Sequence, residues 1–283
     1  MPRGIVPRQP AKTGRQEGRR RPAPAKKSAS KGENVRLRAG SRVRKASPAT
    51  RAQAGVKGWN PLDPGRISEI LKRLDQLYPD VTCALDHKSA WELLVATILS
   101  AQSTDVNVNR VTPELFKKYP AVEDFARLTP EQLQPDIYST GFFRNKSKSV
   151  VGAAKKVVSD FGGQVPDDME KLLTLPGVAR KTANVVLGTW FKKADGVVVD
   201  THVTRISRRL ELTRSEEPQK IEQDLMRAIP REKWILFSHQ IIWHGRKLCF
   251  ARSPKCVDCP LENICHAADK TWSTVEIHKN ATW

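Results

Sequence analysis

The stretch LPGVARKTANVV, residues 175–186, decides the fold. Its Pro-Gly pair predicts a tight turn, because Gly177 permits backbone geometry and close approach that other residues resist. A helix is expected to begin near Arg180, and the preceding MEKLLT is the end of another helix. The first amides of a helix lack partners inside it, so this helix–hairpin–helix can hold a phosphate. The alternative is an ordinary α-turn-α corner with Lys181 in solvent.

The 283-residue chain has a net charge of +19, most of it at one end. Residues 1–57 hold 17 Lys and Arg against 2 Asp and Glu, and no Phe, Trp or Tyr. Such a segment cannot bury enough apolar surface to offset the entropy of ordering it, so we predict a disordered basic tail. It would attract polyanions, although a solubilising or targeting extension is the alternative.

The rest of the chain has apolar residues at helical spacing, as in ISEILKRLDQLYP and SVVGAAKKVVSDF. The one strand-like run, GVVVD, is too short to support a sheet, so we predict an all-α fold. Neither a secretory signal nor a run of 18 apolar residues occurs, so we expect an intracellular protein that binds no membrane.

Four of the five cysteines fall within 17 residues, with the spacing C-x6-C-x2-C-x5-C. In a reducing compartment, such spacing indicates a metal site rather than disulfides. Four thiolates suit zinc or an iron–sulfur cube, and the irregular spacing favours the larger cluster. The ligands are Cys249, Cys256, Cys259 and Cys265. The lone Cys83 is expected to be a buried core thiol.

Two further features surround these motifs. In GVVVDTHVTRISRRL, Asp200 is expected at a helix N-cap, where free amides and the helix dipole favour an ionised carboxylate. An ionised Asp and an amine at a DNA-anchored turn are the pair needed to attack a sugar carbon. Lys181 can be the nucleophile only if its pKa is lowered, by desolvation or by a cation such as Arg180. The loop FARSPK places Arg252 and Lys255 where a phosphate could be met, or in solvent.

Together these motifs resemble the endonuclease III family, helix–hairpin–helix DNA glycosylase/lyases of base excision repair with a [4Fe–4S] cluster. The resemblance covers about residues 60–268. It rests on ILSAQSTDVNVN (98–109), GFFRNKSKSV (141–150), LPGVARKTANVV, VVDTH (198–202) and the cysteine spacing. One position departs from the family: its commonest hairpin is LPGVG, and here Ala179 replaces the second glycine.

The resemblance implies a role for each site residue. Lys181 matches the Schiff-base nucleophile, Asp200 the catalytic carboxylate, and the four cysteines the ligands of the [4Fe–4S] cluster. Gln102 matches the residue that fills the gap left by an extruded base, and Phe142 an apolar wedge on the opposite strand. The remaining matches are DNA contacts at Gly177, Ala179, Arg180, Arg252 and Lys255, and lesion-pocket positions at Ser100, Asp105 and His202.

The resemblance also implies the architecture. A six-helix barrel domain with the hairpin would cover residues 83–193, and an iron–sulfur cluster domain would combine 58–82 with 194–270. Residues 1–57 and 271–283 would be tails. The active site would lie between the two domains.

The expected activity is removal of oxidised pyrimidines from duplex DNA and cutting 3′ to the abasic site by β-elimination, by a monomer. A thymine- or adenine-mismatch glycosylase of the same superfamily, or a non-catalytic DNA-binding helix–hairpin–helix protein, is the alternative. The expected location is the bacterial cytoplasm and nucleoid, or the nucleus or an organelle of a eukaryote.

Overall fold

The computed structural model describes residues 60–271, and this range contains helices and loops without a strand. The all-α class is therefore confirmed, and GVVVD is a loop. The tails expected at 1–57 and 271–283 lie outside the described residues, apart from Thr271. None of the described helices is long and apolar enough to span a membrane. The α-helices are α2 (Pro64–Leu77), α3 (Ala90–Leu99), α4 (Asp105–Lys118), α5 (Val122–Arg127), α6 (Pro130–Ile137), α7 (Phe143–Phe161), α8 (Met169–Leu173), α9 (Arg180–Thr189), α10 (Thr201–Arg209), α11 (Pro218–Ala228) and α12 (Trp234–Lys247), and the 3-10 helices are η1 (Tyr138–Thr140), η2 (Arg231–Lys233) and η3 (Glu262–Ile264).

Several helices begin at a polar residue that caps them. The Asp63 carboxylate accepts a hydrogen bond from the Arg66 amide at 3.0 Å at the start of α2, and Ser89 and Thr104 cap α3 and α4 in the same way. Such a side chain satisfies an amide that has no partner inside the helix. The local sequence therefore sets where these helices begin.

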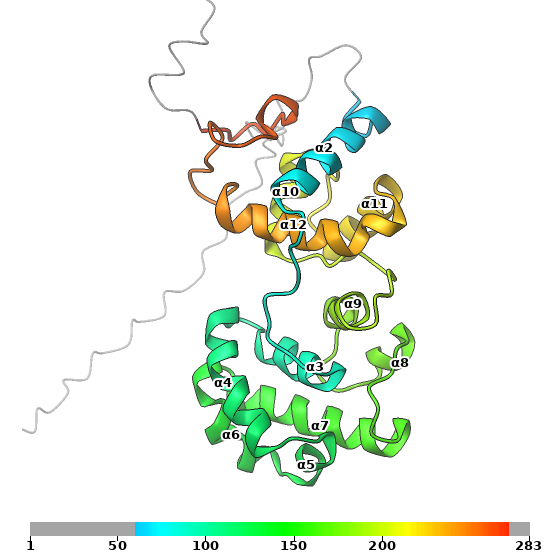
Figure 1. Cartoon of the computed structure of the whole chain (residues 1–283), viewed down its shortest axis with the longest axis vertical. Coiled ribbons are helices and arrows are strands. Elements are labelled where there is room, and N and C mark those ends of the chain that lie inside the picture. The colour runs from blue at the N-terminus through cyan, green and yellow to red at the C-terminus, as the bar shows by residue number, and fades with distance from the viewer. Residues whose placement is uncertain (1–59, 272–283) are drawn as a thin grey trace, which may run out of the picture. The chain divides into compact units, whose positions relative to one another are not determined.

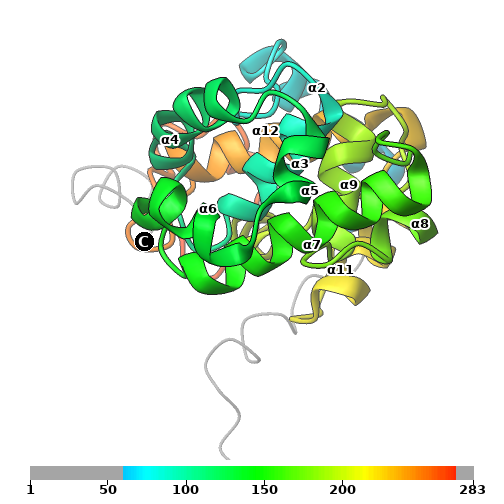
Figure 2. The ribbon, with the colours of Figure 1, turned by 90° about the horizontal axis from the view of Figure 1, so that it is seen from below.

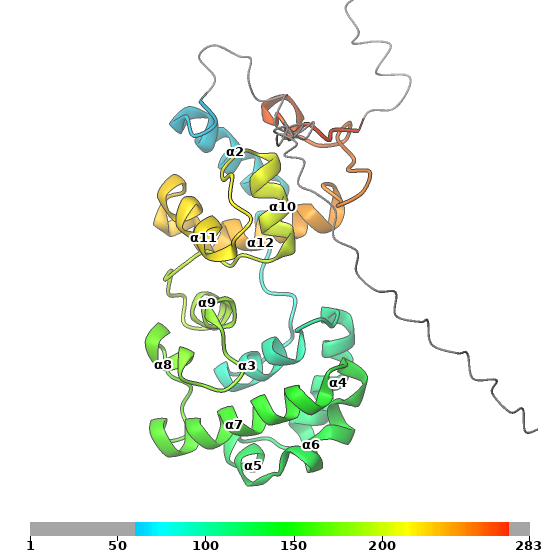
Figure 3. The same ribbon diagram turned by 180° about the vertical axis from the view of Figure 1, so that it is seen from behind.

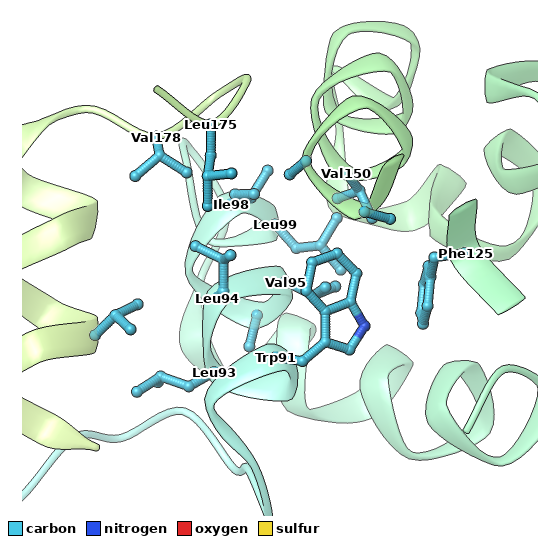
Figure 4. Close-up of a cluster of buried hydrophobic side chains, with 14 of the residues drawn as sticks. Trp91, Leu93, Leu94, Val95, Ile98, Leu99, Phe125, Val150, Leu175 and Val178 are labelled. Carbon is cyan, nitrogen blue, oxygen red and sulfur yellow. The ribbon is translucent and has the colours of Figure 1, made fainter. Parts of the chain in front are cut away.

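Helix α3 is the centre of a first hydrophobic core, because its sequence AWELLVATIL is apolar on nearly every side. In Figure 4, Leu175 and Val178 of the hairpin lie beside Ile98 of α3, whereas Phe125 and Val150 lie toward its other side. Helices α5 and α6 pack along the 19-residue α7 (Figure 2). The hairpin is therefore fixed by apolar contacts to the most buried helix of this core.

A second hydrophobic core joins the two ends of the described chain. Helix α2 packs against α12, and Figure 1 and Figure 3 show the two side by side. Apolar residues of α10 and α11 belong to the same core. The apolar side of α2, with Ile70 and Leu74 fully buried, contributes directly to this core. The N-terminal helix of the described chain thus shares one core with the C-terminal helices.

Candidate active site

The hairpin turn requires glycine at position 177 for two reasons. Gly177 has φ +77°, a left-handed conformation that costs other residues about 1–2 kcal/mol. A Cβ at this position would also lie 2.4 Å from Cβ of Ser149 on α7. The turn closes with a hydrogen bond from the Val178 amide to the Leu175 carbonyl at 3.1 Å. The backbone after Gly177 is thus held against α7.

Helix α9 begins at Arg180, as the sequence predicts, and its N-terminus has no side-chain cap. The N-cap residue is Ala179, whose φ of −95° and ψ of 170° are extended backbone that alanine adopts without strain. The substitution of alanine for the family's glycine is therefore compatible with the turn. Lys181, the second residue of α9, is exposed. The first turn of α9 thus presents amides and an amine on the surface.

The Arg180 side chain is committed to an ion pair that the sequence does not reveal. Its Nε donates to Oε2 of Glu222 on α11 at 2.7 Å. Glu222 is buried and also accepts a hydrogen bond from Nδ2 of Asn184 at 2.8 Å. Two residues of α9 are therefore tied to the helix α11 of the second core. DNA contact by Arg180 stays a prediction, and the ion pair gives it a role in orienting α9.

Asp200 is the N-cap of α10, as the sequence predicts. Its Oδ1 accepts a hydrogen bond from the Val203 amide at 2.8 Å, and its carbonyl accepts one from Thr204 at 2.8 Å. The positive end of the helix dipole favours negative charge at this carboxylate. One carboxylate oxygen is thus anchored on α10.

Around Asp200 lies a group of charged side chains from three helices. Burial lowers the pKa of His202, Asp200 acts to raise it, and Arg205 and Arg246 lower it further. Nη2 of Arg246, on α12, donates to Oδ2 of Asp105, on α4, at 2.6 Å. Arg246 thus links two predicted pocket residues, because it pairs with Asp105 and acts on His202, which in turn senses Asp200. Arg246 was missed, because its partner is 141 residues away and no local pattern indicates the pair.

Two exposed residues occupy left-handed backbone in neighbouring loops. Gln102 has φ +54° in the loop between α3 and α4, and Phe142 has φ +49° just before α7. Phe142 is 60% exposed. Ser100 caps the end of α3, and its hydroxyl donates to the Thr97 carbonyl at 2.8 Å. Gln102 and Phe142 therefore project from tight, strained turns.

The four cysteines surround one small cavity behind the last turn of α12. N–H groups point at two of the sulfurs: Nη1 of Arg209 lies 3.2 Å from Sγ of Cys249, and the Thr271 amide lies 3.4 Å from Sγ of Cys256. Burial, with the other three cysteines, raises the pKa of Cys259 to about 11. Burial raises the pKa of Cys265 as well. A bound metal cation would favour the thiolate form, so a set of four cysteine sulfurs around one cavity fits a thiolate-bound metal group.

Within residues 60–271, no three His, Cys, Asp or Glu side chains stand close enough to hold one metal ion. Arg209 was also missed as part of this region. It is buried, bonds the Phe250 and Ala251 carbonyls of the cysteine loop and pairs with Asp269 at 2.6 Å. It holds the loop between the first two cysteines against α10.

That loop carries the two basic residues expected to meet DNA. Arg252 and Lys255 are both exposed. Nζ of Lys255 lies 5.8 Å from the ring centre of Phe250, and its amide donates to the Leu248 carbonyl at 2.9 Å. The loop backbone is thus ordered, and DNA contact by either side chain stays a prediction. The lone Cys83 is partly buried and packs against the first core, so it is less buried than the expected core thiol.

Comparison with known proteins gives the family. Residues 95–231 match the model of the HhH-GPD superfamily base excision DNA repair protein. The chain is 54% identical over 203 residues to endonuclease III of Synechocystis sp., covering 72% of this chain and 93% of that protein. It is 43% identical over 206 residues to endonuclease III of Bacillus subtilis, covering 72% and 94%.

Solved structures agree. A trapped covalent intermediate of endonuclease III with DNA has a TM-score of 0.69 at 40% identity, covering 72% of this chain and 95% of that one. A thermostable thymine-DNA glycosylase, at 21% identity and a TM-score of 0.63, shares the fold. The hairpin, the uncapped start of α9 and the capped start of α10 agree with these relatives. The chain therefore belongs to the endonuclease III family of base excision DNA repair enzymes, which are DNA glycosylases and apurinic/apyrimidinic lyases.

Proposed function

We propose that this chain removes oxidised pyrimidines from duplex DNA with Lys181 as the nucleophile, and then cuts the strand 3′ to the abasic site. One observation carries the proposal: Lys181 is exposed in the first turn of an uncapped helix, directly after a turn fixed at Gly177. The free amides of that turn can bind a backbone phosphate. The amine would then lie near the sugar of the damaged nucleotide, which is one step along the DNA strand from that phosphate.

The chemistry needs an amine and a carboxylate. The Lys181 amine attacks C1′, the glycosidic bond breaks and the base leaves with its electron pair and takes up a proton. The attached nitrogen then loses a proton, the C1′–O4′ bond opens and O4′ takes up a proton, which leaves an imine at C1′. The imine acidifies the 2′ hydrogen, so loss of that proton breaks the C3′–O bond and the 3′ phosphate leaves with its electron pair. Asp200 stabilises the positive charge that develops on the sugar and takes part in activating the amine. A bound phosphate lowers the entropy cost of bringing amine and sugar together.

The exposed loops supply DNA recognition. A damaged base must leave the helical stack before C1′ can be reached. We assign Gln102 to the gap left by that base and Phe142 to the opposite strand, because both project from strained turns into solvent. Contacts to phosphates are assigned to Gly177, Ala179, Arg180, Arg252 and Lys255, and the lesion pocket to Ser100, Asp105 and His202.

We also propose a [4Fe–4S] cluster at Cys249, Cys256, Cys259 and Cys265. The shared cavity and the N–H groups aimed at sulfur support it. Its role would be structural, because it fixes the loop that carries Arg252 and Lys255, and no step of the reaction passes through it. Protein purified from iron-replete cells should be yellow-brown, with iron and sulfide. Colourless protein containing zinc would contradict the assignment.

The two hydrophobic cores support a division into a barrel domain (83–193) and a cluster domain (58–82 with 194–270). We propose a monomer that works on chromosomal DNA, in the nucleoid of a bacterium or in the nucleus or an organelle of a eukaryote. A sedimentation measurement of the protein with and without duplex DNA tests the monomer.

Borohydride trapping tests the nucleophile. Wild-type protein should form a covalent adduct on duplex DNA with an abasic site or an oxidised pyrimidine. Lys181→Gln should form none but keep most of its binding, because the hairpin amides remain. Lys155→Gln is the matched control, since Lys155 is an exposed lysine on α7. Adduct formation by Lys181→Gln at the wild-type rate would show that another amine is the nucleophile.

A further inference from the structure

A buried lysine lies between the two exposed loops that carry Gln102 and Phe142. Lys146, on α7, is only 4% exposed, and burial lowers its pKa. Its Nζ donates to the carbonyl of Leu99 at 2.7 Å and to the carbonyl of Thr140 at 2.8 Å. Both of these partners are backbone carbonyls rather than carboxylates. Burying an ammonium group is costly, so these two bonds offset a penalty that an apolar residue would not incur.

The two carbonyls are at informative positions. Leu99 ends α3 immediately before the Gln102 loop (residues 100–104), and Thr140 belongs to the Phe142 loop (residues 138–142). The backbone amide of Lys146 also donates to the Phe142 carbonyl at 3.0 Å. One residue therefore bonds to the base of the first loop and twice to the second.

A second connection lies nearer the surface. Nδ2 of Asn107, on α4, donates to Oγ of Ser103 at 3.1 Å and to the carbonyl of Ser139 at 2.9 Å. Ser103 belongs to the Gln102 loop and Ser139 to the Phe142 loop. The side chain of Asn107, on α4, thus bridges the two loops directly, and that of Lys146, on α7, joins the Phe142 loop to the end of α3 just before the Gln102 loop.

Such bridging has a physical purpose here. Left-handed backbone at a residue other than glycine is strained and persists only where the surroundings fix it. Both loops contain such a residue, Gln102 and Phe142. Charge-assisted hydrogen bonds from a buried ammonium to carbonyls are about twice as strong as neutral ones. They can therefore hold the two turns at a fixed separation before DNA binds.

We propose that Lys146 and Asn107 are positioning residues that lock the Gln102 loop and the Phe142 loop into one rigid unit, so that both side chains enter the duplex together. The proposal rests on the roles of Gln102 and Phe142 given under the proposed function. It assigns to Lys146 and Asn107 the preorganisation of the strand-separating surface, without direct contact to the reacting atoms.

The test compares cutting at an abasic site in duplex DNA with cutting at the same site in single-stranded DNA. A single strand has neither a gap to fill nor an opposite strand to wedge, so its cutting does not need the locked unit. Lys146→Met removes the donors at nearly constant volume, and Asn107→Ala removes the outer bridge. Lys155→Met is the control, because it removes an exposed ammonium from the same helix.

We expect the ratio of duplex to single-strand cutting to fall about tenfold or more in Lys146→Met, and severalfold in Asn107→Ala. The ratio in Lys155→Met should equal that of the wild type. The proposal is overturned if the ratio of duplex to single-strand cutting is unchanged in both Lys146→Met and Asn107→Ala. It is also overturned if the cutting rates on the two substrates fall equally. If Lys146→Met does not fold, the cutting ratio of Asn107→Ala alone tests the proposal. A wild-type protein that cuts neither substrate would instead contradict the proposed function.

A second readout isolates the coupling between the loops. If the unit is rigid, the effects of Gln102→Ala and Phe142→Ala on duplex affinity should be non-additive in the wild type. The same two substitutions made in Asn107→Ala should become more nearly additive. Additive effects in the wild type would show that the loops act independently and would refute the locked unit.

Discussion

Helices α9 and α10 follow each other in the chain, yet their N-termini are built in opposite ways. The first turn of α10 is closed by Asp200, whose carboxylate accepts the Val203 amide at 2.8 Å. The first turn of α9 begins at Ala179, which has no side chain able to cap it. One helix start thus holds an internal negative charge, and the other leaves its amides for an external one.

The difference indicates how two similar local structures can serve different steps. An uncapped start forgoes about 0.5–2 kcal/mol of stability relative to a Ser, Thr, Asp or Asn cap. In exchange, its amides and the positive end of its dipole can hold a phosphate. The capped start uses the same dipole to favour a carboxylate that the reaction needs. Changing the N-cap of α10 should therefore affect the chemistry, and changing the N-cap of α9 should affect DNA binding.

The largest effect is expected where the charge of the capped start is removed. Asp200→Asn keeps an N-cap, because asparagine can accept the Val203 amide. The fold and the thermal unfolding midpoint should therefore change little. Base release should slow by about 10²–10³-fold or more, since a charge that acts chiefly in the transition state is lost. Single-turnover excision of an oxidised pyrimidine measures the effect.

A matched control separates capping from chemistry. Asp63 is the N-cap of α2 and accepts the Arg66 amide at 3.0 Å, so it has the same local role as Asp200. Asp63→Asn should leave the excision rate at its wild-type value. Equal rates for Asp200→Asn and wild-type protein would mean that Asp200 is only a cap.

The second effect comes from closing the open start. Ala179→Asp should cap α9 and raise stability by about 0.5–2 kcal/mol. It should also weaken duplex binding by roughly tenfold or more, because the new carboxylate occupies the amides and repels the phosphate. Ala179→Gly should bind like the wild type, since the extended backbone at 179 suits either residue. Titration of a labelled duplex at fixed salt gives the affinities, and tighter binding by Ala179→Asp would contradict a phosphate site here.

The third effect concerns the turn that precedes α9. Gly177→Ala should destabilise the protein by about 1–3 kcal/mol, from left-handed backbone and from overpacking. The overpacking arises because the new Cβ would lie 2.4 Å from Cβ of Ser149. Ser149→Gly in the same protein should restore the steric part alone. Urea unfolding measures both, and full recovery would show that the left-handed φ contributes nothing.

The features that the sequence predicts are those that depend on residues close together in the chain. The start of α9 at Arg180 and the cap at Asp200 follow from local turn and capping chemistry, and both are confirmed. The bonds of Lys146 and Arg246 reach partners 47 and 141 residues away. Local periodicity carries no information on such pairs, so the sequence presents Lys146 only as part of the motif GFFRNKSKSV.

Arg180 shows the same limit from the other side. The sequence assigns it to DNA and to the neighbourhood of Lys181, because it adjoins both the hairpin and that lysine. Its actual partner, Glu222, is 42 residues away on a helix of the second core. Only the packing of α9 against α11 determines that this guanidinium is already paired.

The smallest effect concerns the electrostatics of the capped start and can be measured at His202. Burial lowers the pKa of this histidine, and Asp200 opposes that shift. Asp200→Asn should therefore lower the pKa of His202 further, which an NMR titration would show, with His202→Gln to assign the signal.

A histidine whose pKa is lower in the folded state binds fewer protons there than in the unfolded chain. Its stability contribution is lost as pH falls from about 6.5 toward the folded pKa. The acid side of the stability profile should thus steepen in Asp200→Asn. If the pKa of His202 rises or does not change in Asp200→Asn, Asp200 does not stabilise the charged form of its neighbour. The capped start of α10 would then be electrostatically no different from an uncharged one.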